Sequence, residues 1–262
     1  MRERIEQRAD HLFNAHRDGL TFKSFGGQDR IDTITEAYAV QNAYVERLVA
    51  STGNGIAGYK VGLTSPRMQA LLGIDSPIAG AVLKNRVLTS GVAISRADFG
   101  QLGMECEIAV LMGRDLAPSR APFSAEDVAA AVDAVCPAFE VVDDRCADYG
   151  ETDIYSLVAD NSWNAGVVLG AWSDEWPELA GLEGVLLRNG DVLDRGRGED
   201  VLGHPFNALT WLANHLAGGP RGLRAGDVIA TGSMVPTRMP LEPETCLFRI
   251  EGLGEVEINV VD

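Results

Sequence analysis

The chain has 262 residues, of which 46% are hydrophobic, and its formal net charge is −16 at pH 7. This length and composition are sufficient for one large folded core and exclude a disordered tail. The negative charge argues against a broad binding surface for nucleic acid or anionic membrane lipids, because such surfaces need clustered lysine and arginine.

The N-terminal region is predicted to be helical. Residues 2–18 place apolar side chains at helical spacing in a highly charged segment that does not resemble a secretory signal. Thr33 and Glu36 form a capping-box pattern, which predicts a second helix that ends before Gly53. No apolar run in the chain reaches about 18 residues, the length of a membrane-spanning helix. We therefore expect a cytoplasmic protein without a membrane segment.

A short strand with a single cation follows these helices. Residues 56–65 have strand character and carry Lys60 between two glycines. The residue pattern alone leaves open whether Lys60 is a solvated strand residue or a functional cation. Pro66 is typical of a helix start and predicts a short helix over residues 66–72.

Strand patterns outnumber helix patterns after residue 80. Residues 77–98 resemble β-hairpins, and a helix is predicted from Ser124 to the residue before Pro137. A second amphipathic helix begins at Pro205. Further strands are predicted within 105–112, 138–142, 167–170, 184–194, 225–233 and 246–261.

These elements predict an α+β fold. Few strands alternate with crossover helices, which argues against a doubly wound parallel sheet and favours a largely antiparallel or mixed β core. We expect residues 1–80 to form a helical N-terminal region packed on the core as an appendage. Residues 81–262 would form a mixed β domain that carries the functional site.

The cysteines and histidines form no compact metal-binding or redox motif. Cys106, Cys136, Cys146 and Cys246 contain no CxxC pair, so reduced and mostly buried thiols are expected. The four histidines form no HExxH motif.

Three carboxylates lie within apolar strands. Glu105 and Glu107 are spaced by two, which directs both to one face of a strand, and Glu140 stands inside a second apolar segment. A buried ionised carboxylate is costly unless a cation or hydrogen bonds compensate its charge. Three carboxylates with open positions suit Mg²⁺, Ca²⁺ or Mn²⁺ better than Zn²⁺. The alternative is a solvent-facing edge strand with one buried ion pair.

Several motifs in order resemble one family. Over roughly residues 35–260, the chain is similar to the 2-oxopent-4-enoate hydratase and 4-oxalocrotonate decarboxylase branch of the fumarylacetoacetate hydrolase superfamily. The motifs are GYKVGLTS (58–65), ECEIA (105–109), FEVVD (139–143), ADN (159–161), LGHP (202–205), WLAN (211–214) and GDVI (226–229).

This resemblance implies a mixed β-roll around a divalent metal, usually Mg²⁺ or Mn²⁺, with Glu105, Glu107 and Glu140 as its ligands. Family substrates are 2-oxo acids, and a cation beside the 2-oxo group stabilises enolate character. Lys60 matches a family lysine near the substrate carboxylate or the developing enolate. The resemblance also implies a homo-oligomer and possible association with a partner enzyme of the same pathway.

The resemblance leaves three reactions open. The leading prediction is a hydratase that acts on a short unsaturated 2-oxo acid in aromatic-compound catabolism. The alternatives are a 4-oxalocrotonate-type decarboxylase, an acylpyruvate- or fumarylpyruvate-type C–C hydrolase, and, from a different class, a non-catalytic accessory subunit. Hydratases of this branch tend to carry an acid at the position of Ile78. The decarboxylases tend to have isoleucine there, as this chain does. Trp163 replaces a small residue and either narrows the pocket or packs in the core.

Other polar residues near the motifs are candidates for the reaction. Asp160 and His204 are predicted catalytic residues, with a structural hydrogen-bonding role as the alternative for each. Arg145 could bind a second substrate carboxylate, although a surface salt bridge with Asp143 or Asp144 is favoured. The predicted substrate-binding residues are Ser65, Leu72, Ile78, Trp163, Thr231 and Ser233.

Overall fold

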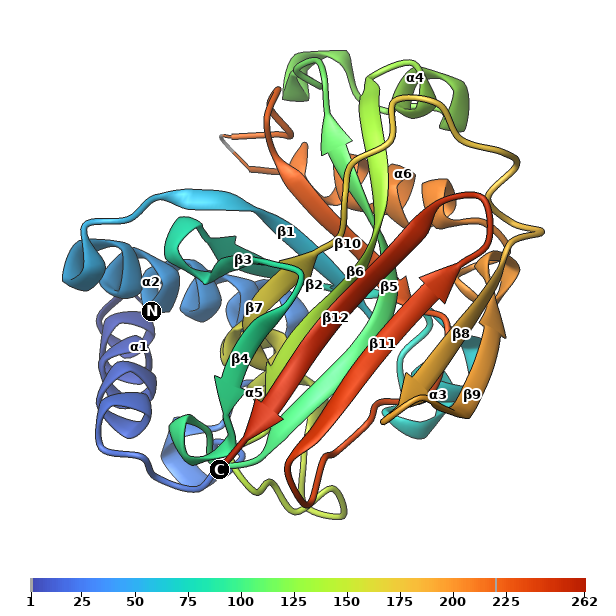
Figure 1. Ribbon diagram of the computed structural model, residues 1–262. Helices are drawn as coiled ribbons and strands as arrows, with labels where there is room; N and C mark the ends of the chain where they lie inside the picture. Colours follow the sequence, from blue (N-terminus) through green and yellow to red (C-terminus); the bar gives the residue numbers. More distant parts are fainter. Residues whose placement is uncertain (1, 220) are drawn as a thin grey trace.

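The computed structural model describes residues 2–219 and 221–262, and their strands form two sheets (Figure 1). The larger sheet has the order β2-β1-β10-β5-β6-β7-β3, and the smaller one has the order β4-β12-β11-β8-β9. The helices are α1 (Arg2–Arg17), α2 (Ile34–Thr52), α3 (Pro66–Leu71), α4 (Ala125–Ala129), α5 (Ile154–Ala159) and α6 (Pro205–Leu216). The strands are β1 (Ile56–Gly62), β2 (Ile78–Leu83), β3 (Val87–Thr89), β4 (Val92–Ser95), β5 (Leu102–Met112), β6 (Val132–Asp143), β7 (Asn164–Leu169), β8 (Glu183–Arg188), β9 (Asp191–Arg197), β10 (Val228–Ser233), β11 (Glu244–Ile250) and β12 (Gly254–Val261).

The larger sheet is mixed, as expected for the α+β class. β1 runs parallel to β10 and β3 runs parallel to β7, whereas β5 and β6 form a long antiparallel pair at the centre. Gly58 allows the close approach of β1 to β10, because a Cβ atom there would lie 1.8 Å from the carbonyl oxygen of Val228. The central strands are therefore fixed in a register that determines which side chains meet.

Both faces of this sheet are covered. Strands β11 and β12 pack against β6 (Figure 1). Phe248 approaches Phe139 with ring centroids 6.2 Å apart. Helix α6 packs on β10 and β1 from another side, and its buried Leu209 and Leu212 belong to the same apolar cluster. Burial of these apolar surfaces is the main stabilising contribution.

The two predicted N-terminal helices are present as α1 and α2. The hydroxyl of Thr33 accepts a hydrogen bond from the Glu36 N–H, and Gly53 ends α2 with a left-handed φ of 68°. Arg8 is buried between the helices and donates to Glu36 at 2.6 Å and to the carbonyl of Asp29 at 2.7 Å. β1 and β2 lie in the larger sheet, and the division of the chain at residue 80 stays a prediction.

Residues 161–163 form a left-handed turn that covers the free edge of β2. Asn161, Ser162 and Trp163 have φ values of 52°, 51° and 58°. The Asn161 side chain accepts from the Ala81 N–H at 2.7 Å and donates to the Ala81 carbonyl at 2.9 Å. The Ser162 hydroxyl donates to the Ala79 carbonyl at 2.9 Å. These bonds replace the missing strand neighbour and bring this turn beside the site described below.

Two secondary-structure predictions, for residues 124–136 and for residues 77–98, were wrong. The helix expected from Ser124 to Pro137 ends at Ala129, and Val132 begins β6, because the pairing of β6 with β5 and β7 overrides the local helix pattern. Strands β2, β3 and β4 do not form hairpins with one another. They pair instead with β1, β7 and β12.

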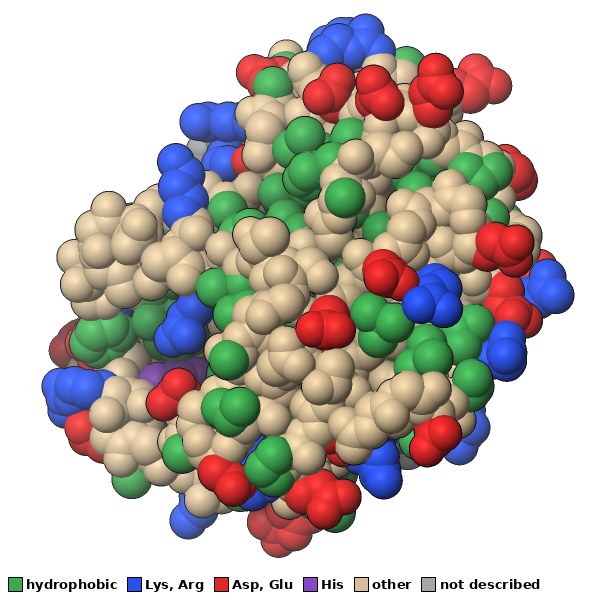
Figure 2. All heavy atoms as spheres, in the orientation of Figure 1, with side chains coloured by type: hydrophobic (Ala, Val, Ile, Leu, Met, Phe, Trp, Pro, Cys, Tyr) green, Lys and Arg blue, Asp and Glu red, His purple; other side chains and the backbone are tan. Residues whose placement is uncertain are grey.

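The surface of the protein is charged. The buried cysteines are free thiols. On the face shown in Figure 2, lysine and arginine side chains are scattered among acidic ones. Cys106, Cys136 and Cys246 are buried free thiols, as predicted, whereas Cys146 is exposed. Among the helices that the structure describes, none combines the length and the apolar character needed to cross a membrane.

Candidate metal centre

Three glutamates from β5 and β6 converge inside the molecule. Glu105 and Glu107 lie on one face of β5, and Glu140 is the register partner of Glu105 on β6. One carboxylate oxygen from each residue lies within 4.8 Å of the others. This spacing allows the three oxygens to contact one ion. The structure thus brings together the triad that the sequence pattern singled out.

Two of these carboxylates are fully buried and only half satisfied. The Gly232 N–H donates to Glu107 Oε2 at 2.8 Å, and the Asn164 side-chain amide donates to Glu140 Oε1 at 3.0 Å. The other oxygens, Glu107 Oε1 and Glu140 Oε2, are buried and have no hydrogen-bond partner among the described residues. Unpaired buried carboxylate oxygens are costly, and a divalent cation would satisfy both. The triad therefore fits an oxygen-binding metal.

Glu105 completes the triad at its more open side. This residue is half-buried, whereas Glu107 and Glu140 are 0% exposed. Its carboxylate accepts a hydrogen bond from the Thr237 hydroxyl at 2.6 Å. Each of the three acids is therefore held through one oxygen atom, which restricts how its carboxylate can turn.

Lys60 is the cation of the site. It lies on β1 with its Nζ atom 3.1 Å from Glu140 Oε1, and it is 4% exposed. Glycines 62 and 80 make room for this side chain: added Cβ atoms would lie 3.3 Å from its Nζ and Cε atoms, respectively. The structure therefore excludes the interpretation of Lys60 as a solvated strand residue and places its side chain beside the triad.

Burial sets the protonation of this cluster. In the protein without a metal, burial together with the charges of Glu140 and Glu105 raises the pKa of Glu107 well above its usual value. Burial also raises the pKa of Glu140 to about 7, against the opposing effect of Lys60. Burial lowers the pKa of Lys60, but the three glutamates outweigh it and raise that pKa overall. Three ionised carboxylates against one ammonium leave two excess negative charges, which matches a divalent cation.

The predicted substrate-binding residues lie at different distances from the chemistry. Ile78 is close to Lys60, because an added Cβ on Gly62 would lie 3.4 Å from Ile78 and 3.3 Å from Nζ. Trp163 is buried between the rings of Phe22 and Tyr149, with centroids 5.2 and 5.7 Å away, and its indole N–H has no partner among the described residues.

The other four predicted contacts involve hydroxyls or helix ends. The hydroxyl of Thr231 donates to the Ile108 carbonyl at 2.8 Å, and that of Ser233 donates to the Val235 carbonyl at 2.7 Å. Ser65 caps α3, and Leu72 follows this helix as a half-buried residue. Their substrate contacts stay predictions.

Asp160 has a structural partnership that the sequence did not reveal. Its carboxylate pairs with Arg145 and lies 2.6 Å from His16 of α1. Arg145 is buried by this pair, so the favoured surface salt bridge with Asp143 or Asp144 was wrong. Among the described residues, no hydrogen bond joins Asp160 to the triad. A catalytic role for Asp160 stays a prediction.

His204 lies at the start of α6. Its Nδ1 atom accepts the Phe206 N–H at 2.9 Å, as a helix cap does, and its Nε2 atom is 3.0 Å from Glu178. These contacts involve both ring nitrogens. The predicted catalytic role of His204 is untested by this geometry.

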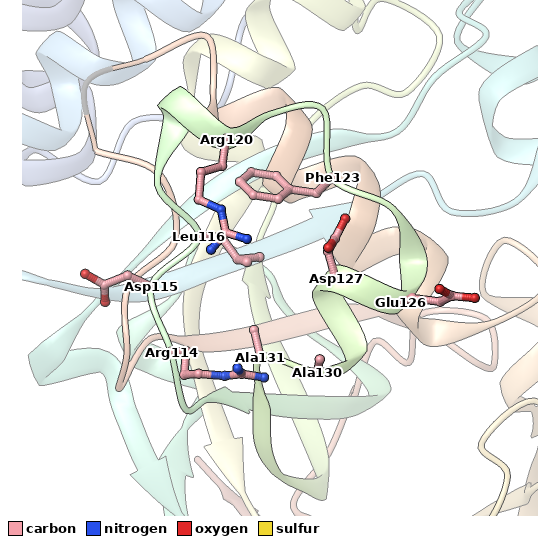
Figure 3. A pocket seen from close by; sticks show the side chains of 9 residues that line it. All are labelled: Arg114, Asp115, Leu116, Arg120, Phe123, Glu126, Asp127, Ala130 and Ala131. Carbon is pink, nitrogen blue, oxygen red and sulfur yellow. The ribbon is translucent and has the colours of Figure 1, made fainter.

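The candidate metal centre is separate from a surface pocket beyond the end of β5. Figure 3 shows this pocket, whose lining includes Arg114, Arg120, Leu116 and Ala131. Its volume is about 230 Å³, and it contains none of the three glutamates. Arg114 lies beyond Met112, where β5 ends, and Met112 is itself about 16 Å from Glu107 along the strand. The metal centre is thus defined by convergent polar groups and not by this cavity.

Comparisons with known proteins agree with the geometry. A family model described as fumarylacetoacetate (FAA) hydrolase C-terminal matches residues 67–261. A 2-keto-4-pentenoate hydratase of Burkholderia vietnamiensis is 36% identical over 230 residues, covering 87% of this chain and 86% of that protein. A 2-oxo-hept-4-ene-1,7-dioate hydratase of Escherichia coli is 37% identical over 217 residues, covering 79% and 80%.

A solved structure is also similar over the whole chain. The 4-oxalocrotonate decarboxylase from Pseudomonas putida G7, complexed with magnesium and adipate, has a TM-score of 0.92 and 30% sequence identity. The match covers 100% of this chain and 98% of that chain.

Proposed function

Because the chain belongs to the fumarylacetoacetate hydrolase family, we propose that it is a divalent-metal-dependent hydratase that adds water to a short unsaturated 2-oxo acid. The observation that carries the proposal is the convergent triad of Glu105, Glu107 and Glu140 beside Lys60. The names of the two hydratases compared above support the reaction, and both names contain a 2-oxo acid.

We infer that the cation is Mg²⁺ or Mn²⁺. All-carboxylate ligation favours hard cations, and a structural relative was solved with magnesium. When bound, such a cation polarises the 2-oxo group and stabilises negative charge that develops on its oxygen. Glu105, Glu107 and Glu140 would hold it through the oxygens that accept no hydrogen bond.

Lys60 is the proposed catalytic cation of the protein itself. Its buried ammonium lies next to Glu140, where it would stabilise the substrate carboxylate or the developing enolate. In the protein without a metal, the surrounding glutamates raise the pKa of Lys60, which favours its charged form. Ile78 lies next to Lys60 and would form an apolar wall there.

A decarboxylase is the second candidate, and Ile78 is the observation that favours it. An isoleucine offers no proton donor or acceptor where a hydratase needs to handle water. The structural relative that is 30% identical over the whole chain is itself a decarboxylase. The chain is similar to both kinds of enzyme, so the products must decide between them.

A substrate panel tests the proposal with the purified full chain and Mg²⁺ or Mn²⁺. A hydratase converts 2-hydroxypenta-2,4-dienoate and water into 4-hydroxy-2-oxopentanoate and releases no CO₂. Stoichiometric CO₂ from 2-oxohex-3-enedioate would identify the decarboxylase instead. Pyruvate released together with a second carboxylic acid from an acylpyruvate would identify a C–C hydrolase.

The metal ligands are tested by Glu107→Gln. This change keeps the shape of the side chain but removes the charge of a ligand that is 0% exposed. We expect loss of metal binding, measured by calorimetry, together with loss of turnover. If both survive the change, the metal centre is not where we propose it. An accessory subunit without catalysis would show no turnover in the unmodified protein.

We also propose four features that rest mainly on similarity. The chain would assemble as a homo-oligomer, associate with an enzyme of the same pathway, and act in the cytoplasm. Helices α1 and α2, which share an apolar cluster with α5, would form an appendage of the catalytic domain. Sedimentation of the purified protein, alone and with candidate partners, tests the first two.

A further inference from the structure

We propose that Thr237 is a positioning residue for Glu105, and that the segment Gly232–Arg238 sets the affinity of the site for its divalent cation. This inference rests on the proposed metal centre and adds a determinant outside the three glutamates. The observation behind it is that this segment, which comprises the end of β10 and the residues after it, runs along β5 and donates hydrogen bonds to two of the three acids.

The first step is the contact with Glu105. The hydroxyl of Thr237 lies 2.6 Å from Glu105 Oε1, and it is the one hydrogen bond that the described residues give this carboxylate. Glu105 is also the least buried acid of the triad, so packing restrains it least. Without the hydroxyl, Glu105 would lose conformational entropy each time a cation bound, which weakens binding.

The second step is what holds Thr237 in place. The next residue, Arg238, exchanges two backbone hydrogen bonds with Met104 of β5, each of 2.8 Å. Its guanidinium donates to both oxygens of the buried Glu244, at 3.0 and 2.8 Å. A bidentate ion pair of this kind restricts the orientation of the guanidinium. Thr237 is therefore anchored directly opposite Glu105 by its neighbour.

The third step is the other end of the segment. The Gly232 N–H donates to Glu107, and the Ser233 hydroxyl accepts the Cys106 N–H at 3.1 Å. Gly232 has a φ of 119°, and a Cβ atom there would lie 2.5 Å from the Thr64 side chain, so only glycine fits. The segment is thus fixed at both ends while it spans Glu107, Cys106 and Glu105.

Calorimetric titration of the metal-free full chain with Mn²⁺ tests the inference. Thr237→Val keeps the shape of the side chain and removes the hydroxyl, and we expect the Kd to rise by about 10–100-fold. Thr237→Ser restores the hydroxyl and should bind within about threefold of the unmodified protein. Equal affinities for the unmodified and valine proteins would overturn the inference.

Thr245→Val is a matched control. Thr245 also donates from its hydroxyl, to Asn259 at 2.9 Å, but it lies in the smaller sheet, and its hydroxyl donates to none of the three glutamates. We expect its Kd for Mn²⁺ to be unchanged, and an equal rise would show a general loss of stability instead. If the unmodified protein binds no Mn²⁺ at all, the proposed function falls with this inference. If it binds and Thr237→Val binds equally, only this inference falls.

Discussion

At the scale of single residues, the site combines the permanent positive charge of Lys60 with a triad that could bind an exchangeable cation. The ammonium of Lys60 is part of the chain and stays in place, whereas the glutamates leave two buried oxygens free for an ion. Ion and ammonium repel one another, and both attract the negative charge of a substrate. Removal of the Lys60 ammonium should therefore have a different effect from removal of the bound cation.

Lys60→Met should separate turnover from metal binding. Methionine fills the space of the lysine stem but carries no charge, so we expect kcat to fall by about 10²–10³-fold. The affinity for Mn²⁺ should not weaken, because the variant lacks a repelling ammonium next to Glu140. Steady-state kinetics and calorimetric titration measure the two effects. A variant that keeps its kcat would remove Lys60 from the proposed chemistry.

The triad was predictable from sequence, whereas the residue that donates a hydrogen bond to Glu105 was not. The spacing of Glu105 and Glu107 is visible in any strand pattern, and the family motifs add Glu140. Thr237 lies in a loop that has no periodicity. Its contact depends on the pairing of Arg238 with Met104, which are 134 positions apart in the printed sequence. Such a contact is a property of the folded register alone.

At the scale of elements, a buried charge pair joins α1 to the core. Asp160 follows α5 and is held by Arg145 from the loop after β6 and by His16 from α1. Arg145 also donates to the carbonyl of Leu20 at 2.8 Å and lies 5.7 Å from the centroid of the Phe22 ring. These contacts fix the chain that leaves α1 against the turn at 161–163.

Arg145→Ala should destabilise this junction strongly. It would leave the carboxylate of Asp160, which is 0% exposed, without its main cation, and we expect about 3–5 kcal/mol of lost unfolding free energy. Arg249→Ala is the matched control, because its pair with Glu255 is exposed and should contribute only about 0–1 kcal/mol. Urea unfolding measures both. Similar losses for the two variants would contradict this account.

Element prediction succeeded where the pattern was local. The cap of α2 at Thr33 and its end at Gly53 follow from short-range chemistry, and both are present. The helix predicted up to Pro137 failed because Val132 and its successors gain more from pairing with β5 and β7 than from continuing α4. Long-range pairing is not encoded in a window of the sequence.

At the scale of the whole molecule, the candidate metal centre couples stability to pH. The folded metal-free protein holds protons on Glu107 and Glu140 that the unfolded chain releases at lower pH, because burial raises both pKa values. This contribution to stability is complete below pH 4.5, the usual pKa of a glutamate. It is lost as the pH rises through the folded value, which for Glu140 is about 7. A cation reverses the trend, because it binds the ionised carboxylates.

We therefore expect Mn²⁺ to raise the melting temperature more at about pH 8 than at about pH 5.5. Thermal unfolding with Mn²⁺ and with a chelator, at both pH values, measures the difference. In Glu107→Gln, Mn²⁺ should not raise the melting temperature at either pH, since this variant lacks one of the metal ligands. An increment that does not depend on pH in the unmodified protein would argue against proton release from these acids.

The pairing of Glu105 with Glu140 across β5 and β6 also predicts where this chain tolerates changes in length. Successive side chains of a strand alternate between faces, so one residue inserted between positions 105 and 107 would turn one of these acids away from its partners. The 19 residues that connect the two strands, 113–131, lie outside this constraint. Insertions and deletions accumulated during evolution should therefore concentrate in that connection and be excluded from the paired strands.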